Sequence, residues 1–78
     1  MAIVRLSEIK PGESCRLHHM ELYGGMRRRL LELGFLPEVQ LHMMISAPSG
    51  SPKMIWCKNS MVAVRTKDCD RILVERCG

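Results

Sequence analysis

The chain has 78 residues, of which 46% are hydrophobic, and twelve Lys and Arg against eight Asp and Glu give it a formal net charge of +4. This length favours one domain over residues 1–78, because a chain of this size buries only about 60% of the surface that its unfolded form exposes. The modest charge and only three aromatic residues, Tyr23, Phe35 and Trp56, argue against nucleic-acid binding, which uses clustered cations and stacking aromatics.

The first predicted elements are a single helical turn and a strand. Ser7 is expected to cap the turn, because its side chain can accept a hydrogen bond from the turn's backbone. Residues 14–20 then alternate as a strand. Leu17 and His19 share one face of this strand, and Met20 lies on the other face.

The hydrophobic period changes to that of a helix from Met26. Met26, Leu30 and Leu33 fall within about 60° of one another on a helical wheel, which predicts one buried stripe. Gly34 suits a left-handed helix cap, and Pro37 prevents the helix from resuming. We therefore expect one helix of two to three turns.

Residues 39–46 show the clearest strand pattern in the chain. The residues expected on its buried face are Val39, Leu41, Met43 and Ile45. Residues 53–58 and 61–65 follow as antiparallel partners, with a turn at Asn59-Ser60 between them.

One more helical turn and one more strand complete the prediction. Thr66 is expected to cap the turn, and residues 71–76 form the strand, with Ile72 and Val74 facing the same way. The count is five short strands and one short helix, with no crossover long enough for a nucleotide-binding fold. The fold predicted is therefore mainly β, a small five-stranded antiparallel barrel.

The chemistry-bearing residues show no convincing enzyme or zinc pattern. The four cysteines, Cys15, Cys57, Cys69 and Cys77, form no C-x2-C pair, and no Cys or Ser stands beside a base and an orienting acid. His18 and His42 are the candidates for a metal ligand, without a convergent set around them. We expect no catalysis, mostly buried thiols that act as small apolar residues, and solvent-facing histidines. A redox role for the thiols is the rival interpretation.

The start of the chain lacks the pattern of a signal peptide, and no segment approaches the roughly 18 apolar residues of a membrane span. We therefore expect a cytoplasmic protein with reduced thiols that is not inserted in a membrane.

Two stretches are candidate contact surfaces. Arg27, Arg28 and Arg29 spread around the predicted helix, where they are either solvated, bound to a backbone carbonyl or in contact with an acidic partner. The second stretch is a loop rich in proline and glycine, which is either a well-specified turn or a rigid contact surface that loses little entropy on docking. Its residues are Ala47, Pro48, Ser49, Gly50, Ser51 and Pro52.

The order and spacing of several short motifs resemble the FeoA family over nearly the whole chain. The motifs are "LSEIKPGES", "RLLELGF-P", "APSGSP", "AVR" and "DCDRILV". Three departures from the family pattern are present: Ser51 stands where the loop usually has Asp, Glu38 stands where Gly commonly follows Pro37, and Asp68-Cys69 stands where Glu-Ala usually precedes the last strand. Glu38 adds a Cβ where the family's Gly tolerates a positive φ.

The resemblance implies a Src-homology-3-like barrel and a role in bacterial ferrous iron uptake. It implies a non-enzymatic accessory protein that docks on the cytosolic domain of the permease FeoB and modulates it. Docking would use the three arginines and the proline-glycine loop. The alternative is a sensor or regulatory module that binds a transition metal ion, similar to the C-terminal domain of iron-dependent repressors; no other cofactor is implied, and self-association stays open.

Overall fold

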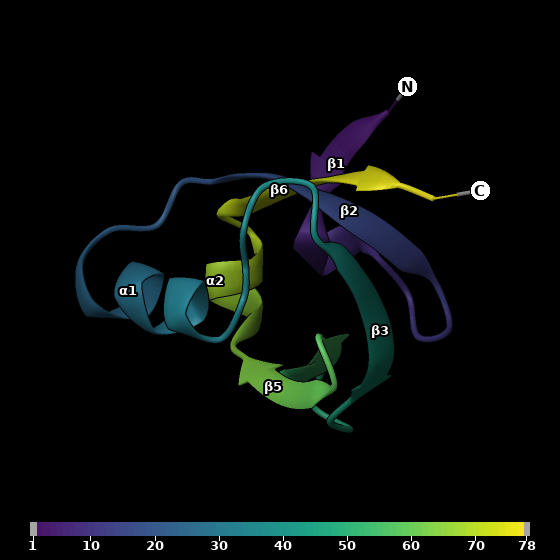
Figure 1. The fold of residues 1–78 in the computed structure, drawn as a ribbon. Helices are drawn as coiled ribbons and strands as arrows, with labels where there is room; N and C mark the ends of the chain where they lie inside the picture. Colours follow the sequence, from purple (N-terminus) through teal and green to yellow (C-terminus); the bar gives the residue numbers. More distant parts are fainter. Residues whose placement is uncertain (1, 78) are drawn as a thin grey trace.

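Six antiparallel strands curl around one core in the computed structural model, which describes residues 2–77. The elements are β1 (Ile3–Arg5), the 3-10 turn η1 (Leu6–Glu8), β2 (Ser14–Met20), α1 (Gly24–Glu32), β3 (Gln40–Ser46), β4 (Lys53–Cys57), β5 (Ser60–Val64), α2 (Thr66–Cys69) and β6 (Ile72–Arg76). The strand order is β1-β6-β2-β3-β4-β5. In Figure 1, α2 lies near the centre, with β5 below it, β3 to the right and α1 at the left end of the molecule. The predicted mainly β class is confirmed, with six strands in place of five.

The strand missing from the prediction is β1. It has only three residues, too few for a periodic pattern, and its pairing with β6 places Val4 opposite Val74. The predicted cap at Ser7 is wrong, because the carboxylate of Glu8 accepts the backbone N–H of Arg5 at 2.8 Å and thereby closes the turn. The Ser7 hydroxyl instead bonds to the carboxylate of Asp70, which joins this turn to the connection between α2 and β6.

A bulge in β2 changes which side chains reach the core. The register against β6 shifts between Leu17 and His19. Leu17 is buried and His19 is exposed, as expected of a core leucine and a solvent-facing histidine, but the two do not share a face, and Met20 is buried, so the predicted alternation is wrong from His19 onward. An extra residue in one strand reverses the alternation beyond it, and sequence alternation alone does not show where that happens.

A second bulge acts in the same way on β3. The register against β4 shifts between Met43 and Ile45, and Ile45 is exposed although alternation placed it in the core. Leu41 and Met43 are buried as predicted. The next turn also differs by one residue, since β5 begins at Ser60 and the turn residues are Lys58 and Asn59, both with positive φ.

The end of α1 sets the path of the chain into the sheet. The N–H of Phe35 donates to the carbonyl of Leu30 at 2.9 Å, and the N–H of Gly34 donates to Leu31 at 3.1 Å. Gly34 has φ +103°, so these bonds form the left-handed helix end predicted for it. Leu30 and Phe35 are both fully buried, whereas Met26 and Leu33 of the predicted stripe are only half-buried against the core.

A tight turn follows this helix end. The N–H of Val39 donates to the carbonyl of Leu36 at 3.0 Å across Pro37 and Glu38, and Glu38 has φ +74°. Glycine is the residue that normally occupies this third position, because a Cβ is disfavoured at positive φ. Glu38 therefore stores backbone strain, which its exposed and long contact with Arg16 at 3.9 Å does little to offset.

Three of the four thiols belong to the core. Cys15, Cys57 and Cys69 are fully buried, and Cys77 is half-exposed. Burial raises the pKa of Cys15 and of Cys69 to about 12, and it also raises the pKa of Cys57. These thiols stay protonated at neutral pH and pack as small apolar groups.

We expect Leu30→Ala to lower the free energy of unfolding by about 2–5 kcal/mol, because it removes a fully buried side chain from the helix face. Leu33→Ala, at a half-buried position of the same helix end, serves as the matched control and should cost less. Urea denaturation of both variants measures the difference. Equal losses would mean that the wrong side of α1 has been assigned to the core.

We expect Glu38→Gly to raise the free energy of unfolding by about 1 kcal/mol, because relief of the positive φ outweighs the greater entropy of unfolded glycine. Glu38→Ala removes the same carboxylate but keeps the strain, so it should leave stability unchanged or slightly lower. Denaturant unfolding distinguishes the two. A destabilised glycine variant would show that the turn is not strained.

We expect iodoacetamide at pH 8 to alkylate Cys77 rapidly and the other three thiols only as the protein unfolds, because the buried thiols are both inaccessible and protonated. Mass spectrometry with peptide mapping counts the labelled sites. Cys77→Ser should abolish the rapid phase. Rapid labelling of Cys15 or Cys69 in the folded protein would contradict their burial.

Candidate functional site

The three arginines of α1 have different environments. The guanidinium of Arg27 is half-buried and donates to the carbonyl of Met20 at 3.1 Å, so it holds the helix against the end of β2. Arg28 and Arg29 are exposed, and neither takes part in an ion pair within residues 2–77. The backbone-carbonyl role is therefore seen at Arg27, and the free guanidinium groups of this helix are those of Arg28 and Arg29.

The loop from Ala47 to Pro52 is held on both sides. Within it, the N–H of Gly50 donates to the carbonyl of Ala47 at 2.7 Å. From outside, the hydroxyl of Thr66 donates to the carbonyl of Gly50 at 2.7 Å, and the N–H of Thr66 donates to the hydroxyl of Ser51 at 3.1 Å. Thr66 thus anchors the loop and does not cap α2 as predicted; the cap position is Arg65.

The structure does not bring these two predicted surfaces together. Figure 1 places α1 at one end of the molecule and the β3–β4 loop beyond the far end of β3. The loop follows the C-terminal end of β3 and leads into β4. The helix α1 lies between the C-terminal end of β2 and the N-terminal end of β3, so it is at the other end of β3. A partner would contact both surfaces only by spanning much of the protein.

The candidate metal ligands are also separate. Ser14 pairs with His42 across the strands, so His18 lies four residues further along β2, about 13 Å away at the usual strand rise. Within residues 2–77 no three His, Cys, Asp or Glu side chains converge on a possible metal position. These residues therefore do not fit a transition metal site of the usual kind.

His42 has a partner that the sequence did not reveal. One ring nitrogen, Nδ1, is hydrogen-bonded to the hydroxyl of Ser14 on the neighbouring strand. No carboxylate in the described part of the chain bonds to this ring. The pair therefore lacks the third, orienting group of a nucleophilic triad.

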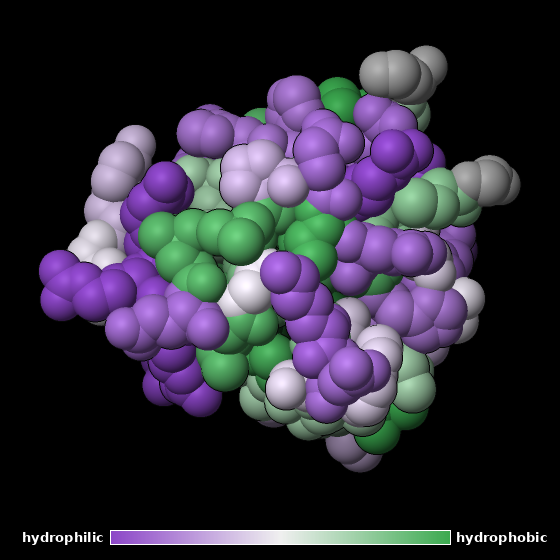
Figure 2. Space-filling model, in the orientation of Figure 1, coloured by the Kyte–Doolittle hydropathy of each residue, from purple (hydrophilic) through white to green (hydrophobic). Residues whose placement is uncertain are grey.

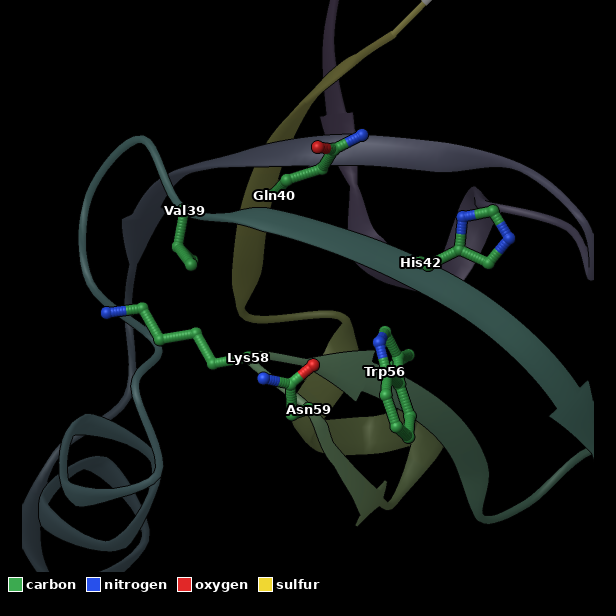
Figure 3. Close-up of a pocket in the computed structure, with 6 residues that line it drawn as sticks. All are labelled: Val39, Gln40, His42, Trp56, Lys58 and Asn59. Carbon is green, nitrogen blue, oxygen red and sulfur yellow. The ribbon is translucent and has the colours of Figure 1, made fainter.

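A shallow groove of about 380 Å³ lies between β3 and the end of the β4–β5 hairpin. Its lining residues are Val39, Gln40, His42, Trp56, Lys58 and Asn59. The pairing of β3 with β4 begins at His42 and Trp56, and the chain before His42 diverges from the hairpin turn. Figure 3 shows Lys58 and Asn59 on one side of this opening and Val39 on the other, with Trp56 beside the turn.

Sequence reasoning missed this groove. Its residues come from two segments distant in the sequence, 39–42 and 56–59, and one of them, Val39, was expected on the buried face of its strand. The usable signal was the unusual Trp56 at an outward position of a strand, where 40% of its surface stays exposed. The groove offers an aromatic face, one cation and two amide side chains, which equips it for binding.

No helix in the described part of the chain is both long enough and apolar enough to cross a membrane.

Comparison with known proteins identifies the family. The model of the FeoA domain matches residues 4–76. None of the curated proteins matches this chain at a significant level. Among solved structures, the FeoA protein from Chlorobium tepidum is 27% identical, with a TM-score of 0.92 over 96% of this chain and 71% of that one.

Two further structures bear on the fold and on the metal alternative. The FeoA of Stenotrophomonas maltophilia, complexed with zinc and described as a procaryotic SH3 domain protein, is 26% identical, with a TM-score of 0.78 over 92% of this chain and 89% of that one. A manganese-dependent transcriptional repressor is 12% identical, with a TM-score of 0.86 over 99% of this chain and 42% of that one. At that identity the repressor shows a shared fold alone. The Src-homology-3-like fold is confirmed, and this chain belongs to the FeoA family.

Proposed function

We propose that this protein is a non-enzymatic, cytoplasmic accessory factor of bacterial ferrous iron uptake that docks on the cytosolic domain of the permease FeoB. The observation that carries the proposal is the match of the FeoA domain to residues 4–76, nearly the whole chain. The described surface also presents features suited to protein contact, above all a rigid loop and free arginines.

Docking can modulate the permease only if this protein binds two conformations of the permease with different affinity. A rigid contact surface favours such discrimination, since little entropy is lost when it docks. The loop from Ala47 to Pro52 meets this requirement through its internal bond and its bonds to Thr66. We propose this loop as one contact and the exposed face of α1, with Arg28 and Arg29, as the other.

Arg28 is a better candidate than Arg27 for a direct effect on guanine nucleotide hydrolysis. An arginine finger needs a guanidinium group that is free to reach a phosphate. Arg27 already donates to the carbonyl of Met20, whereas Arg28 is exposed and unpaired within the described chain. Loss of this role would slow hydrolysis without changing the affinity of docking by a similar factor.

The metal-sensing alternative receives no support from the side-chain arrangement. Its two candidate ligands, His18 and His42, are on separate parts of the sheet, and the Nδ1 atom of His42 is engaged by Ser14. The likeness to the manganese-dependent repressor supports a common fold and says nothing about a metal ion in this chain.

We expect isothermal titration calorimetry to show binding of the purified protein to the cytosolic domain of its cognate permease, with an affinity that depends on guanine nucleotide. Arg28→Glu and Pro48→Glu, both at exposed positions, should each weaken binding several-fold by repulsion or by loss of fit. Lys10→Glu, an exposed charge reversal outside both surfaces, is the matched control. Absence of binding in every nucleotide state would refute the proposed function.

A further inference from the structure

The net charge of the protein is concentrated in one segment. Residues 39–67, which contain β3, β4 and β5, include four Lys and Arg and no Asp or Glu. The rest of the chain has eight Lys and Arg and eight Asp and Glu, so it is formally neutral. The whole excess of +4 therefore lies in this segment: Lys53 is in β4, Lys58 is in the turn after it, Arg65 follows β5 directly, and Lys67 is in α2.

The same three strands carry most of the large apolar side chains that are exposed. Of seven such residues in the described chain, four lie here: Met44 at 39%, Ile45 at 62%, Trp56 at 40% and Met61 at 45% exposure. Trp56 pairs with His42 on β3 and with Met61 on β5. His42, Trp56 and Met61 therefore form one row across the outer face of the sheet. Single exposed apolar residues are ordinary, but a cluster of this kind marks an interaction surface.

One cation lies at each end of the β4–β5 hairpin, with Trp56 and Met61 between them. Lys58 lies in the turn directly after β4, two residues beyond Trp56, and Arg65 lies directly after β5, beyond the exposed Met61 and Ala63; both are exposed. No ion pair among residues 2–77 uses Lys58 or Arg65. Both charges are therefore available to a partner, separated by an apolar stretch.

The groove extends this surface towards α1. Lys58 and Asn59 face Val39 across it. On the face shown in Figure 2, apolar surface gathers at the centre, where Figure 1 places the connection from α1 to β3. This connection carries the exposed Leu36. The groove thus has apolar surface on both sides and one free cation within it.

We propose that the groove and the adjoining outer face of β3, β4 and β5 bind an acidic protein segment. In this arrangement, an apolar side chain of the segment packs beside Trp56, and its carboxylates meet Lys58 and Arg65. The proposal rests on the proposed function in that it assigns the segment to the cytosolic domain of the permease. Of the surfaces suggested by the sequence, only the loop from Ala47 to Pro52 belongs to the same part of the sheet.

The chemistry of the surface favours a protein partner over the other anionic partners. A nucleic acid would neutralise the cations, but its sugars and phosphates would leave Met44, Ile45 and Met61 uncovered, and only one aromatic ring is present for stacking. A second copy of the chain, related by twofold symmetry, would place two basic faces without carboxylates against each other. An acidic segment with apolar residues would both neutralise the cations and cover the exposed apolar side chains.

The single Trp makes a direct test possible. Protein labelled with 5-fluorotryptophan gives one 19F NMR signal, that of Trp56 in the groove. We expect this signal to shift on titration with the unlabelled cytosolic domain of the permease, and binding to weaken as sodium chloride rises from 50 to 300 mM. Calorimetry on the same samples measures binding independently of the groove.

Substitutions then test the residues. Lys58→Glu and Trp56→Ala should each weaken binding by about tenfold or more, because they remove the cation and the aromatic contact. Arg71→Glu, an exposed charge reversal outside residues 39–67, is the matched control and should stay within about twofold. Thermal unfolding of each variant checks that the fold is retained. Unchanged binding in folded Lys58→Glu and Trp56→Ala would overturn the proposal.

The outcomes separate this proposal from the proposed function. Calorimetric binding without a shift of the Trp56 signal would overturn the groove assignment and leave docking intact. If the permease domain does not bind, the proposed function fails, and a 12-residue peptide of alternating Glu and Leu decides the groove by shifting the signal or leaving it unchanged. A shift caused only by oligothymidylate or by phosphatidylglycerol vesicles would overturn the acidic protein segment as the occupant.

Discussion

The left-handed end of α1 at Gly34 is the constraint on which the rest of the structure depends. It lets the chain turn directly from the helix into the core at Phe35. The N–H of Phe35 donates to the carbonyl of Leu30, and both side chains are fully buried. A Cβ on Gly34 would stand 3.0 Å from Cδ of Lys58, so this exposed side chain would have to shift slightly to admit it. One glycine therefore fixes the helix end and the position of the largest core side chain.

The two bulges have an equally direct effect on the surface. In β2 the bulge turns Met20 inward, and in β3 it turns Ile45 outward. The buried Met20 is part of the hydrophobic core. The second adds an apolar side chain to the outer face that already carries Trp56 and Met61. Local irregularity in the strands thus supports both packing and the proposed binding surface.

The protein divides into a formally neutral part and a basic part. The neutral part contains β1, β2, α1 and β6, and the ion pairs found among residues 2–77 both lie in it, from Arg16 to Glu38 and to Glu75. The basic part presents cations without such partners beside exposed apolar groups. The exposed apolar groups beside these cations are the surface that the proposed acidic segment would cover.

The sequence by itself determined the class of fold, the helix end at Gly34, the buried Leu41, Met43, Ile72 and Val74, and the family resemblance. These follow from local periodicity and backbone preference, which act within a few residues. Only the tertiary structure decided the bulges, the short strand β1, the anchoring of the loop by Thr66 and the groove around Trp56. Each of these depends on contacts between segments distant in the sequence, where the register of one strand against another chooses which side chains face the core and which face a partner.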